Sequence, residues 1–225
     1  MPLSTRSSEL ELLDGAELDP VELRRNLREM AMLNRLPGGV SSSVSAVLGA
    51  LNGRADASVL DIGAGSGDFA RRLIRRRAVR VIVGDSRAEI LAMARRNLAG
   101  TKGVEFVEAD VRALPLLDGA VDVVHASLLL HHLPPAEAVD AFREMRRVAR
   151  QAVVVNDLRR GLIPFVMSAA PVLAFARSRY TRHDGLASAR RAYTLPEQDA
   201  LAAQAGLRVA HRTPAWWPRV TTLYR

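Results

Sequence analysis

Hydrophobic positions along this chain fall into short continuous runs that alternate with longer segments of helical pattern. The runs are rich in β-branched residues and predict five strands, at 58–62, 79–84, 104–109, 121–127 and 151–157. The segments between them predict helices at 67–77, 87–99 and 135–149. Strands that alternate with helices form a parallel sheet covered on both faces, and nearly continuous apolar runs are typical of such doubly buried strands.

Two further runs, 207–213 and 219–225, close the chain and are separated by a segment that contains proline and tryptophan and is too short for a helix. A connection of this length joins antiparallel strands. The pattern therefore predicts an α/β protein with a doubly wound, seven-stranded, mostly parallel sheet whose last strand is antiparallel.

Segments outside this alternation precede and interrupt the sheet. Residues 20–36 and 40–51 have helical patterns, so we expect residues 1–52 to form an N-terminal cap and residues 53–225 to form the core. The apolar face of the first helix is predicted to consist of Val21, Leu23, Leu27, Met30 and Leu33.

The segment 158–193 is longer than a simple connection needs, and we interpret it as an insertion. It is either a helix packed on the core or a lid over a substrate. Its apolar stretch, 161–176, is too short to span a bilayer, but it is able to contact a lipid surface or to cover an apolar pocket.

Composition excludes several classes of site. The chain contains no cysteine, so disulfides, thiolate metal sites and cysteine nucleophiles are excluded. With 48% hydrophobic and 25% charged residues it is typical of a globular protein rather than a disordered one. The first residues lack the apolar region of a signal peptide, and we expect a cytoplasmic protein.

The net charge of +8 raises the question of a nucleic-acid partner. Lys102 is the only lysine, so the charge is a general excess of arginine in an alanine-rich chain. The densest cluster, at 71–77, is interpreted as the solvent face of a helix, and no aromatic side chains alternate with it as platforms for bases. We expect no nucleic-acid partner.

A glycine-rich stretch, VLDIGAGSGDFA at 59–70, follows the first predicted strand. Glycines at this place let the backbone approach a ligand, and the next helix presents free N–H groups to it. The spacing is G-x-G-x-G, whereas dinucleotide-binding loops have G-x-G-x-x-G, and Asp68 places a negative charge where a pyrophosphate would lie. No Gly-Lys-Ser/Thr follows, so a P-loop is also excluded.

The pattern Asp61-x-Gly63-x-Gly65-x-Gly67 resembles motif I of the class I S-adenosylmethionine-dependent methyltransferases, which have a Rossmann-like fold. The resemblance covers about residues 56–157. Within it, 113–134 is similar to the small-molecule branch of that family, which includes quinone-biosynthesis and natural-product methyltransferases.

The resemblance implies S-adenosylmethionine as the cofactor. By position, Asp85 would hold the ribose hydroxyls, Asp110 the adenine amino group, and the backbone of Val111 the ring. The cofactor-binding residues implied in this way are Asp61, Gly63, Ala64, Gly65, Gly67, Asp85, Ser86, Asp110, Val111 and Ser127.

Methyl transfer is a displacement that depends mainly on alignment, but a phenol or alcohol acceptor must also lose its proton. His131 and His132 follow the fourth strand and Asp157 ends the fifth, so they are the candidate catalytic residues, with one of the two imidazoles expected to point away. His183 beside Asp184, in a predicted mobile loop of the insertion, is the rival base. We expect His125 to be a hydrogen-bonded core residue.

In the metal-dependent, catechol-type members of the family that this sequence resembles, Mg²⁺ is bound by acids after the fourth strand and by an Asp-Asn pair after the fifth. The fourth strand has no such acid, and Asn156 and Asp157 occur in the reverse order, so we expect no metal.

The predicted function is methylation of a small, aromatic or phenolic and partly hydrophobic acceptor, with oxygen as the methylated atom. Carbon and nitrogen remain alternatives, and the oligomeric state is open. An RNA methyltransferase and a non-catalytic scaffold of the same fold are the competing functions. Peripheral contact with lipid or a lipidic substrate is a further expectation, from the apolar part of the insertion.

Overall fold

The computed structural model describes residues 3–15, 17–214 and 217–225, and its centre is one seven-stranded sheet. The strand order is β3-β2-β1-β4-β5-β7-β6, and β7 is antiparallel to both of its neighbours. This confirms the predicted sheet and its closing hairpin, although residues 215 and 216 of the predicted connection lie outside the described residues. The strands are β1 (Ser58–Ile62), β2 (Arg80–Asp85), β3 (Val104–Glu108), β4 (Val121–Ser127), β5 (Ala149–Leu158), β6 (Val209–Arg212) and β7 (Arg219–Tyr224).

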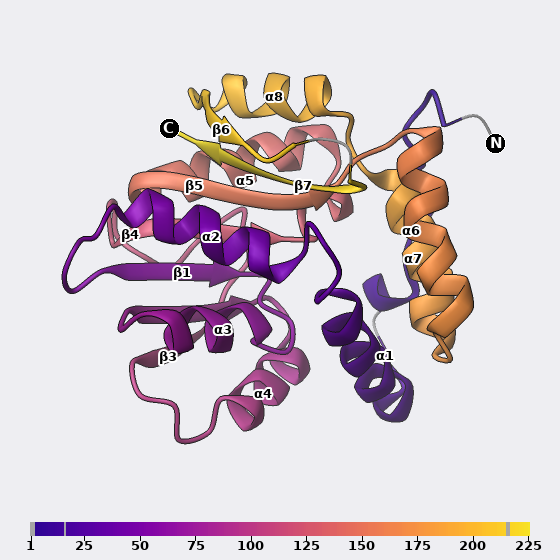
Figure 1. Ribbon diagram of the computed structural model, residues 1–225, viewed down its shortest axis with the longest axis horizontal. Coiled ribbons are helices and arrows are strands. Elements are labelled where there is room, and N and C mark those ends of the chain that lie inside the picture. The colour runs from indigo at the N-terminus through magenta and orange to yellow at the C-terminus, as the bar shows by residue number, and fades with distance from the viewer. Residues whose placement is uncertain (1–2, 16, 215–216) are drawn as a thin grey trace.

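Helices cover both faces of this sheet (Figure 1). One face carries α2 (Val40–Leu51), α3 (Asp68–Arg76) and α4 (Ala88–Asn97), and the other carries α5 (Pro135–Val148) and α8 (Leu195–Gln204). Because successive side chains of a strand point to opposite faces, Val59 packs under the first group and Leu60 under the second. Both are fully buried, which explains the continuous apolar run of β1.

Three more helices lie beyond the carboxyl end of β1: α1 (Pro20–Leu33), α6 (Leu162–Phe175) and α7 (Arg179–Arg191) (Figure 1). Leu23 and Leu27 of α1 pack against Tyr180 of α7, whereas Val21 is 57% exposed and does not belong to the predicted apolar face. The two N-terminal helices therefore have different roles, because α2 belongs to a layer of the sheet. The division of the chain at residue 52 remains a prediction.

The insertion is helical over most of its length. The prediction of a mobile loop around His183 is therefore wrong, because this residue lies within α7. Ser178 caps the start of α7 by accepting a hydrogen bond from the backbone N–H of Tyr180. Gly185 lies inside this helix, where a Cβ atom would come within 3.0 Å of Val172 on α6. The glycine thus permits close helix packing rather than flexibility. Among the helices described here, none is long and apolar enough to cross a membrane.

Candidate active site

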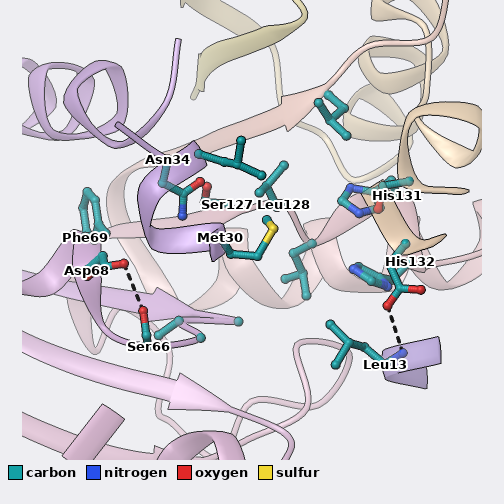
Figure 2. Close-up of a pocket in the computed structure, with 18 of the residues that line it drawn as sticks. Leu13, Met30, Asn34, Ser66, Asp68, Phe69, Ser127, Leu128, His131 and His132 are labelled. Carbon is teal, nitrogen blue, oxygen red and sulfur yellow. Dashed lines mark hydrogen bonds between the residues drawn. The ribbon is translucent and has the colours of Figure 1, made fainter. Parts of the chain in front are cut away.

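A cavity of about 730 Å³ opens at the carboxyl ends of β1, β2 and β4, the edge at which open α/β sheets bind ligands. Its floor is formed by the glycine-rich loop and the tips of these strands, and residues of α1, α6 and α7 line its other walls. Figure 2 shows Ser66, Asp68 and Phe69 at one end of the cavity and His131 and His132 at the other, with Met30 and Leu128 between them.

The glycine-rich loop follows β1 and turns sharply into α3. Gly65 has a φ of +55°, and the position of its missing Cβ has no atom within 4 Å. The backbone N–H of Gly65 donates a hydrogen bond to Asp85 Oδ2 at 3.2 Å, and that of Ala64 donates to the carbonyl of Gly84 at 3.0 Å. The loop is therefore fixed to the end of β2 and leaves bare backbone toward the cavity.

Asp85 ends β2 and is buried in the cavity wall. Its Oδ2 accepts from Gly65 and its Oδ1 from the backbone N–H of Arg87 at 3.1 Å. Each carboxylate oxygen has more than one acceptor site, so both retain capacity for a ligand hydroxyl. Burial raises the pKa of Asp85 above its ordinary value, and the two backbone donors oppose that shift.

Asp61 and His125 face each other in the parallel register of β1 and β4. Oδ1 of Asp61 lies 2.8 Å from Nδ1 of His125, and the imidazole stacks on Phe69 at a centroid distance of 3.7 Å. His125 is thus the hydrogen-bonded buried residue that was expected. Its Nε2 and the Oδ2 of Asp61 have no hydrogen-bond partner among the described residues, although both are buried in the cavity wall.

These two unpaired atoms, the carboxylate oxygen of Asp61 and the ring nitrogen of His125, indicate what kind of ligand the cavity fits. Buried polar atoms are almost always paired in a complete site, so they indicate a ligand with hydrogen-bonding groups. The ammonium and carboxylate of the methionine part of S-adenosylmethionine are groups of that kind. Together with the glycine loop and Asp85, the donor and acceptor set fits this cofactor.

The carboxylate of Asp110, predicted to hold the adenine amino group, already has a partner within the chain. Asp110 forms an ion pair with Arg112, which lowers the pKa of this carboxyl through direct hydrogen bonds. The backbone of Val111 lies beside it in a buried position. Every predicted cofactor-binding residue except Gly67 lines the cavity; Gly67 packs against Leu98 instead.

The opposite end of the cavity holds both adjacent histidines, not one of them. They belong to a short 3-10 helix, η2 (Leu130–His132), and their rings are 4.4 Å apart. Nδ1 of His131 lies 2.6 Å from Oδ1 of Asp157, so the predicted pair is present. Nδ1 of His132 lies 3.1 Å from Oδ1 of Asp14, a partner that the sequence did not indicate.

Glu11 faces both imidazoles and is a site residue that sequence reasoning missed. Its carboxylate oxygens lie 3.6 Å from His131 Nε2 and 3.7 Å from His132 Nε2. Burial raises the pKa of Glu11 to about 7. Burial alone would also raise the pKa of Asp14, but hydrogen bonds from His132 and Arg191 lower it below its ordinary value.

No local motif marks Glu11, because it reaches the cavity only through the docking of the N-terminal segment on α7. Oδ1 and Oδ2 of Asp184 accept the backbone N–H groups of Leu12 and Leu13 at 2.7 and 3.1 Å. Ser188 donates its hydroxyl to Glu11 Oε1 at 2.8 Å. Asp184 is therefore an anchor of the segment that presents Glu11.

The rival base, His183, lies beside the cavity rather than among its lining residues. Its ring contacts Asp184 at 2.8 Å and Glu9 at 3.5 Å. Both oxygens of Asp184 already accept backbone N–H groups of the N-terminal segment. The contact between His183 and Asp184 therefore stabilises the fold of that segment.

A second residue that sequence reasoning missed is Arg219, at the start of β7. Its guanidinium is buried and donates to Ser127 Oγ at 2.9 Å and to Asn156 Oδ1 at 3.0 Å, and it also contacts Asn34. Burial lowers the pKa of Arg219 to about 10. A charged residue at the start of an apolar strand was the only signal for it in the sequence.

Residues 59–152 match the family model described as "Methyltransferase domain". A similar curated protein is the ubiquinone/menaquinone biosynthesis C-methyltransferase UbiE of Hahella chejuensis, 32% identical over 130 residues, which are 55% of this chain and 51% of that protein. This chain thus spans about half the length of that relative.

Solved structures show the same fold at lower identity. A SAM-dependent methyltransferase from Aquifex aeolicus has a TM-score of 0.64 at 19% identity, with 92% of this chain and 98% of that chain covered. The mitomycin 7-O-methyltransferase MmcR has a TM-score of 0.63 at 21% identity, with 90% of this chain and 59% of that chain covered.

The matched domain, the shared fold and a cavity that fits the cofactor agree with the motif order along the strands. These findings support a class I S-adenosylmethionine-dependent methyltransferase, with residues 59–152 matching the methyltransferase domain.

Proposed function

We propose that this protein transfers the methyl group of S-adenosylmethionine to a hydroxyl of a small, aromatic or phenolic and partly hydrophobic acceptor. The observation that supports the proposal is the continuity of the cavity, which joins the glycine loop and Asp85 to the group formed by His131, His132 and Glu11. Apolar side chains also line the cavity, including Met30, Leu128, Met167 and Val172.

When bound, the cofactor supplies an electrophilic methyl group on a sulfonium sulfur. The chain's residues hold the two reactants in line: Gly65 and Asp85 position the cofactor, and the apolar side chains position the acceptor ring. Leu128 is held in the left-handed region with a φ of +52°, a conformation that non-glycine residues adopt when the surroundings impose it. Leu128 directly follows β4 and lies between the glycine-loop end of the cavity and the end that holds the two histidines (Figure 2).

The acceptor's proton would pass to the imidazole group. His131 Nδ1 is held by Asp157 and His132 Nδ1 by Asp14, so both Nε2 atoms are oriented toward Glu11 and the cavity. An imidazole whose other nitrogen is fixed by a carboxylate is an effective proton acceptor near neutral pH. With its methyl group passed to the acceptor oxygen, the cofactor would leave as S-adenosylhomocysteine.

The test is incubation of the purified protein with S-adenosylmethionine labelled at its methyl carbon and a panel of phenols and hydroxylated quinone precursors. We expect a methylated product whose labelled carbon has the NMR shift of a methyl ether. A methyl carbon bonded to carbon would instead support C-methylation, the reaction named for the Hahella relative. No product, with tight cofactor binding retained, would contradict the choice of acceptors.

Two competing functions are separated by simple measurements. A scaffold without catalysis predicts no binding of S-adenosylmethionine in calorimetry, whereas the enzyme predicts binding that Asp85→Asn weakens. An RNA methyltransferase predicts turnover that nuclease treatment abolishes and high salt weakens, because phosphate contacts depend steeply on ionic strength.

We also propose that the outer side of α6 makes peripheral contact with lipid or guides a lipidic acceptor to the cavity. Ile163 and Val166 are 68% and 56% exposed, while Met167 and Val172 of the same helix line the cavity. Ile163→Asp with Val166→Asp should reduce sedimentation with phosphatidylglycerol-containing vesicles, and Leu117→Asp, at an exposed loop position, should not. Equal sedimentation of all three proteins would reject the contact.

A further inference from the structure

Glu11, His131 and His132 place three potential metal ligands in one small volume. The carboxylate and the two imidazoles can each offer one atom such that all three atoms lie within 4.8 Å of one another. The Glu11 oxygens lie 3.6 and 3.7 Å from the two Nε2 atoms. Ligands bound to one tetrahedral zinc ion at about 2.0–2.1 Å are about 3.4 Å apart. The two separations between Glu11 and the imidazoles, each to a different carboxylate oxygen, are close to that value.

The second nitrogen of each imidazole is bound to a carboxylate. Asp157 lies 2.6 Å from Nδ1 of His131, and Asp14 lies 3.1 Å from Nδ1 of His132. In metal sites, such carboxylates fix the tautomer and the direction of the ring, so that the other nitrogen presents its lone pair to the ion. Both Nε2 atoms here are directed at the same residue, Glu11.

We propose that Glu11, His131 and His132 form a binding site for a divalent transition-metal ion of the Zn²⁺ type. Two imidazoles and one carboxylate are a donor set of catalytic zinc sites, in which a fourth position stays open for water or substrate. All three residues line the cavity, so that fourth position faces the space assigned to the acceptor. Mg²⁺ and Ca²⁺ prefer oxygen ligands throughout and do not suit two imidazoles.

Charge balance around the group agrees with a bound dication. Four carboxylates surround it, those of Glu11, Asp14, Asp157 and Asp184, against the guanidinium groups of Arg6 and Arg191. Arg191 is directed mainly at Asp14, at 2.6 Å, and lies 3.9 Å from Glu11. With Glu11 ionised and both imidazoles neutral, the carboxylates outnumber the guanidinium groups by two, an excess that one divalent ion would neutralise.

This site differs from a magnesium site of the catechol type, for which the sequence lacks the expected ligands. That argument concerned oxygen ligands at the tips of the fourth and fifth strands, whereas Glu11 comes from the N-terminal segment. Metal binding as such does not require methyl transfer, but it occupies both Nε2 lone pairs, so in the metal-bound state the imidazoles no longer accept the proton of the acceptor. Its use does rest on that function: an acceptor hydroxyl at the open position would release its proton to solvent more easily, as water does on zinc.

Calorimetric titration of the whole chain with ZnCl₂, after chelator treatment and without cofactor or acceptor, tests the site directly. We expect one equivalent to bind to the wild type. His132→Ala and Glu11→Gln should each weaken binding by at least about 100-fold because a ligand is lost, and Asp14→Asn by about 10–100-fold because a ring is no longer fixed. Titration with Co²⁺ should give visible absorption bands that His132→Ala abolishes.

His211→Ala is the matched control, because it removes an exposed imidazole of β6 and should leave Zn²⁺ affinity unchanged. Glu11→Gln keeps the shape of the side chain, and circular dichroism verifies the fold of each variant. Absence of stoichiometric binding in the folded wild type, or equal affinity in wild type, His132→Ala and Glu11→Gln, would overturn the proposal. Because methyl transfer is assayed separately with methyl-labelled S-adenosylmethionine, failure of the metal site and failure of methyl transfer are distinguishable.

Discussion

Nδ1 of His131 and Oδ1 of Asp157 lie 2.6 Å apart, and both side chains are buried. Burial alone would raise the pKa of Asp157, but the charge and hydrogen bond of His131 hold it below its ordinary value. The carboxylate therefore stays ionised behind the imidazole and fixes the direction of Nε2 toward the cavity. This arrangement joins the tip of β5 to the loop after β4.

Asp157→Asn should reduce methyl transfer without reducing cofactor binding. An amide can present its N–H₂ group to His131, which selects the wrong tautomer and turns Nε2 into a donor. We expect kcat to fall by about 10²-fold, at the lower end of the effect of acid–base catalysis. Calorimetric affinity for S-adenosylmethionine should stay within about twofold, since Asp157 is not among the residues that line the cavity.

The control for this substitution is Asp140→Asn on the exposed side of α5, which should behave as the wild type. Full activity in Asp157→Asn would remove the His131–Asp157 pair from the mechanism.

Asp85→Asn should weaken binding of S-adenosylmethionine by about 10–100-fold, because hydrogen bonds to a charged acceptor contribute about 1.5–3 kcal/mol. The carboxylate accepts two backbone N–H groups and retains acceptor sites for the ribose. Calorimetry measures the affinity, and Asp118→Asn at an exposed loop position is the matched control. Equal affinity in wild type and Asp85→Asn would place the ribose elsewhere.

Cofactor affinity should fall with decreasing pH at a higher pH than an ordinary aspartate, of pKa about 3.9, would produce. The pKa of Asp85 is raised by burial, and only the ionised form accepts from both ribose hydroxyls. Affinity is therefore full above this raised pKa and is lost as the pH falls through it. The Asp85→Asn variant should lack this dependence when both proteins are titrated across the same pH series.

Gly65→Ala and Gly67→Ala should separate cofactor binding from stability. Both residues have positive φ, at +55° and +79°, so each alanine costs about 1–2 kcal/mol of backbone strain. The new methyl group at Gly65 points into open space, whereas at Gly67 it would lie 2.7 Å from Leu98 Cδ1. Gly67→Ala should therefore lose a further 1–3 kcal/mol, about the cost of overpacking, and Gly65→Ala should lose at least about tenfold in cofactor affinity.

Thermal unfolding and calorimetry on the two glycine variants give both quantities. Of the two variants, Gly67→Ala should have the lower melting temperature, and Gly65→Ala should have the lower affinity for S-adenosylmethionine. The reverse order would mean that the ligand approaches the loop from its α4 side.

The fold and the end of the cavity formed by the glycine loop and Asp85 were predictable because their signals are local. The apolar run of β1 predicts that strand without information from the rest of the chain. Gly65 belongs to the same glycine motif that predicts the turn in which it lies. Asp85 follows from its place at the end of a strand, since parallel strands bring their carboxyl ends to one edge.

The end of the cavity that holds the two histidines was not predictable in the same way. Glu11 meets His131 only because α7 docks the N-terminal segment through Asp184 and Ser188, a tertiary contact without a local pattern. Gly185 was misinterpreted for a related reason, because a glycine that permits close packing on Val172 looks in the sequence like a glycine that permits motion.

Asp184→Ala should release the N-terminal segment and with it Glu11 and Asp14. The substitution leaves the backbone N–H groups of Leu12 and Leu13 without their carboxylate, a loss of about 1–3 kcal/mol for each charged hydrogen bond. Hydrogen exchange should accelerate in residues 11–14 and remain unchanged in β1 and β4. Methyl transfer should fall by about tenfold or more, while affinity for S-adenosylmethionine should be unaffected.

The matched variant is His183→Ala, which removes the imidazole beside Asp184 but keeps the carboxylate that binds Leu12 and Leu13. It should retain exchange rates and activity close to the wild type. Loss of activity in His183→Ala with unchanged exchange in residues 11–14 would make His183 the base after all, because its effect would then not pass through the N-terminal segment. Loss in Asp184→Ala alone, together with faster exchange in residues 11–14, would assign the acceptor end of the site to the position of Glu11 and Asp14.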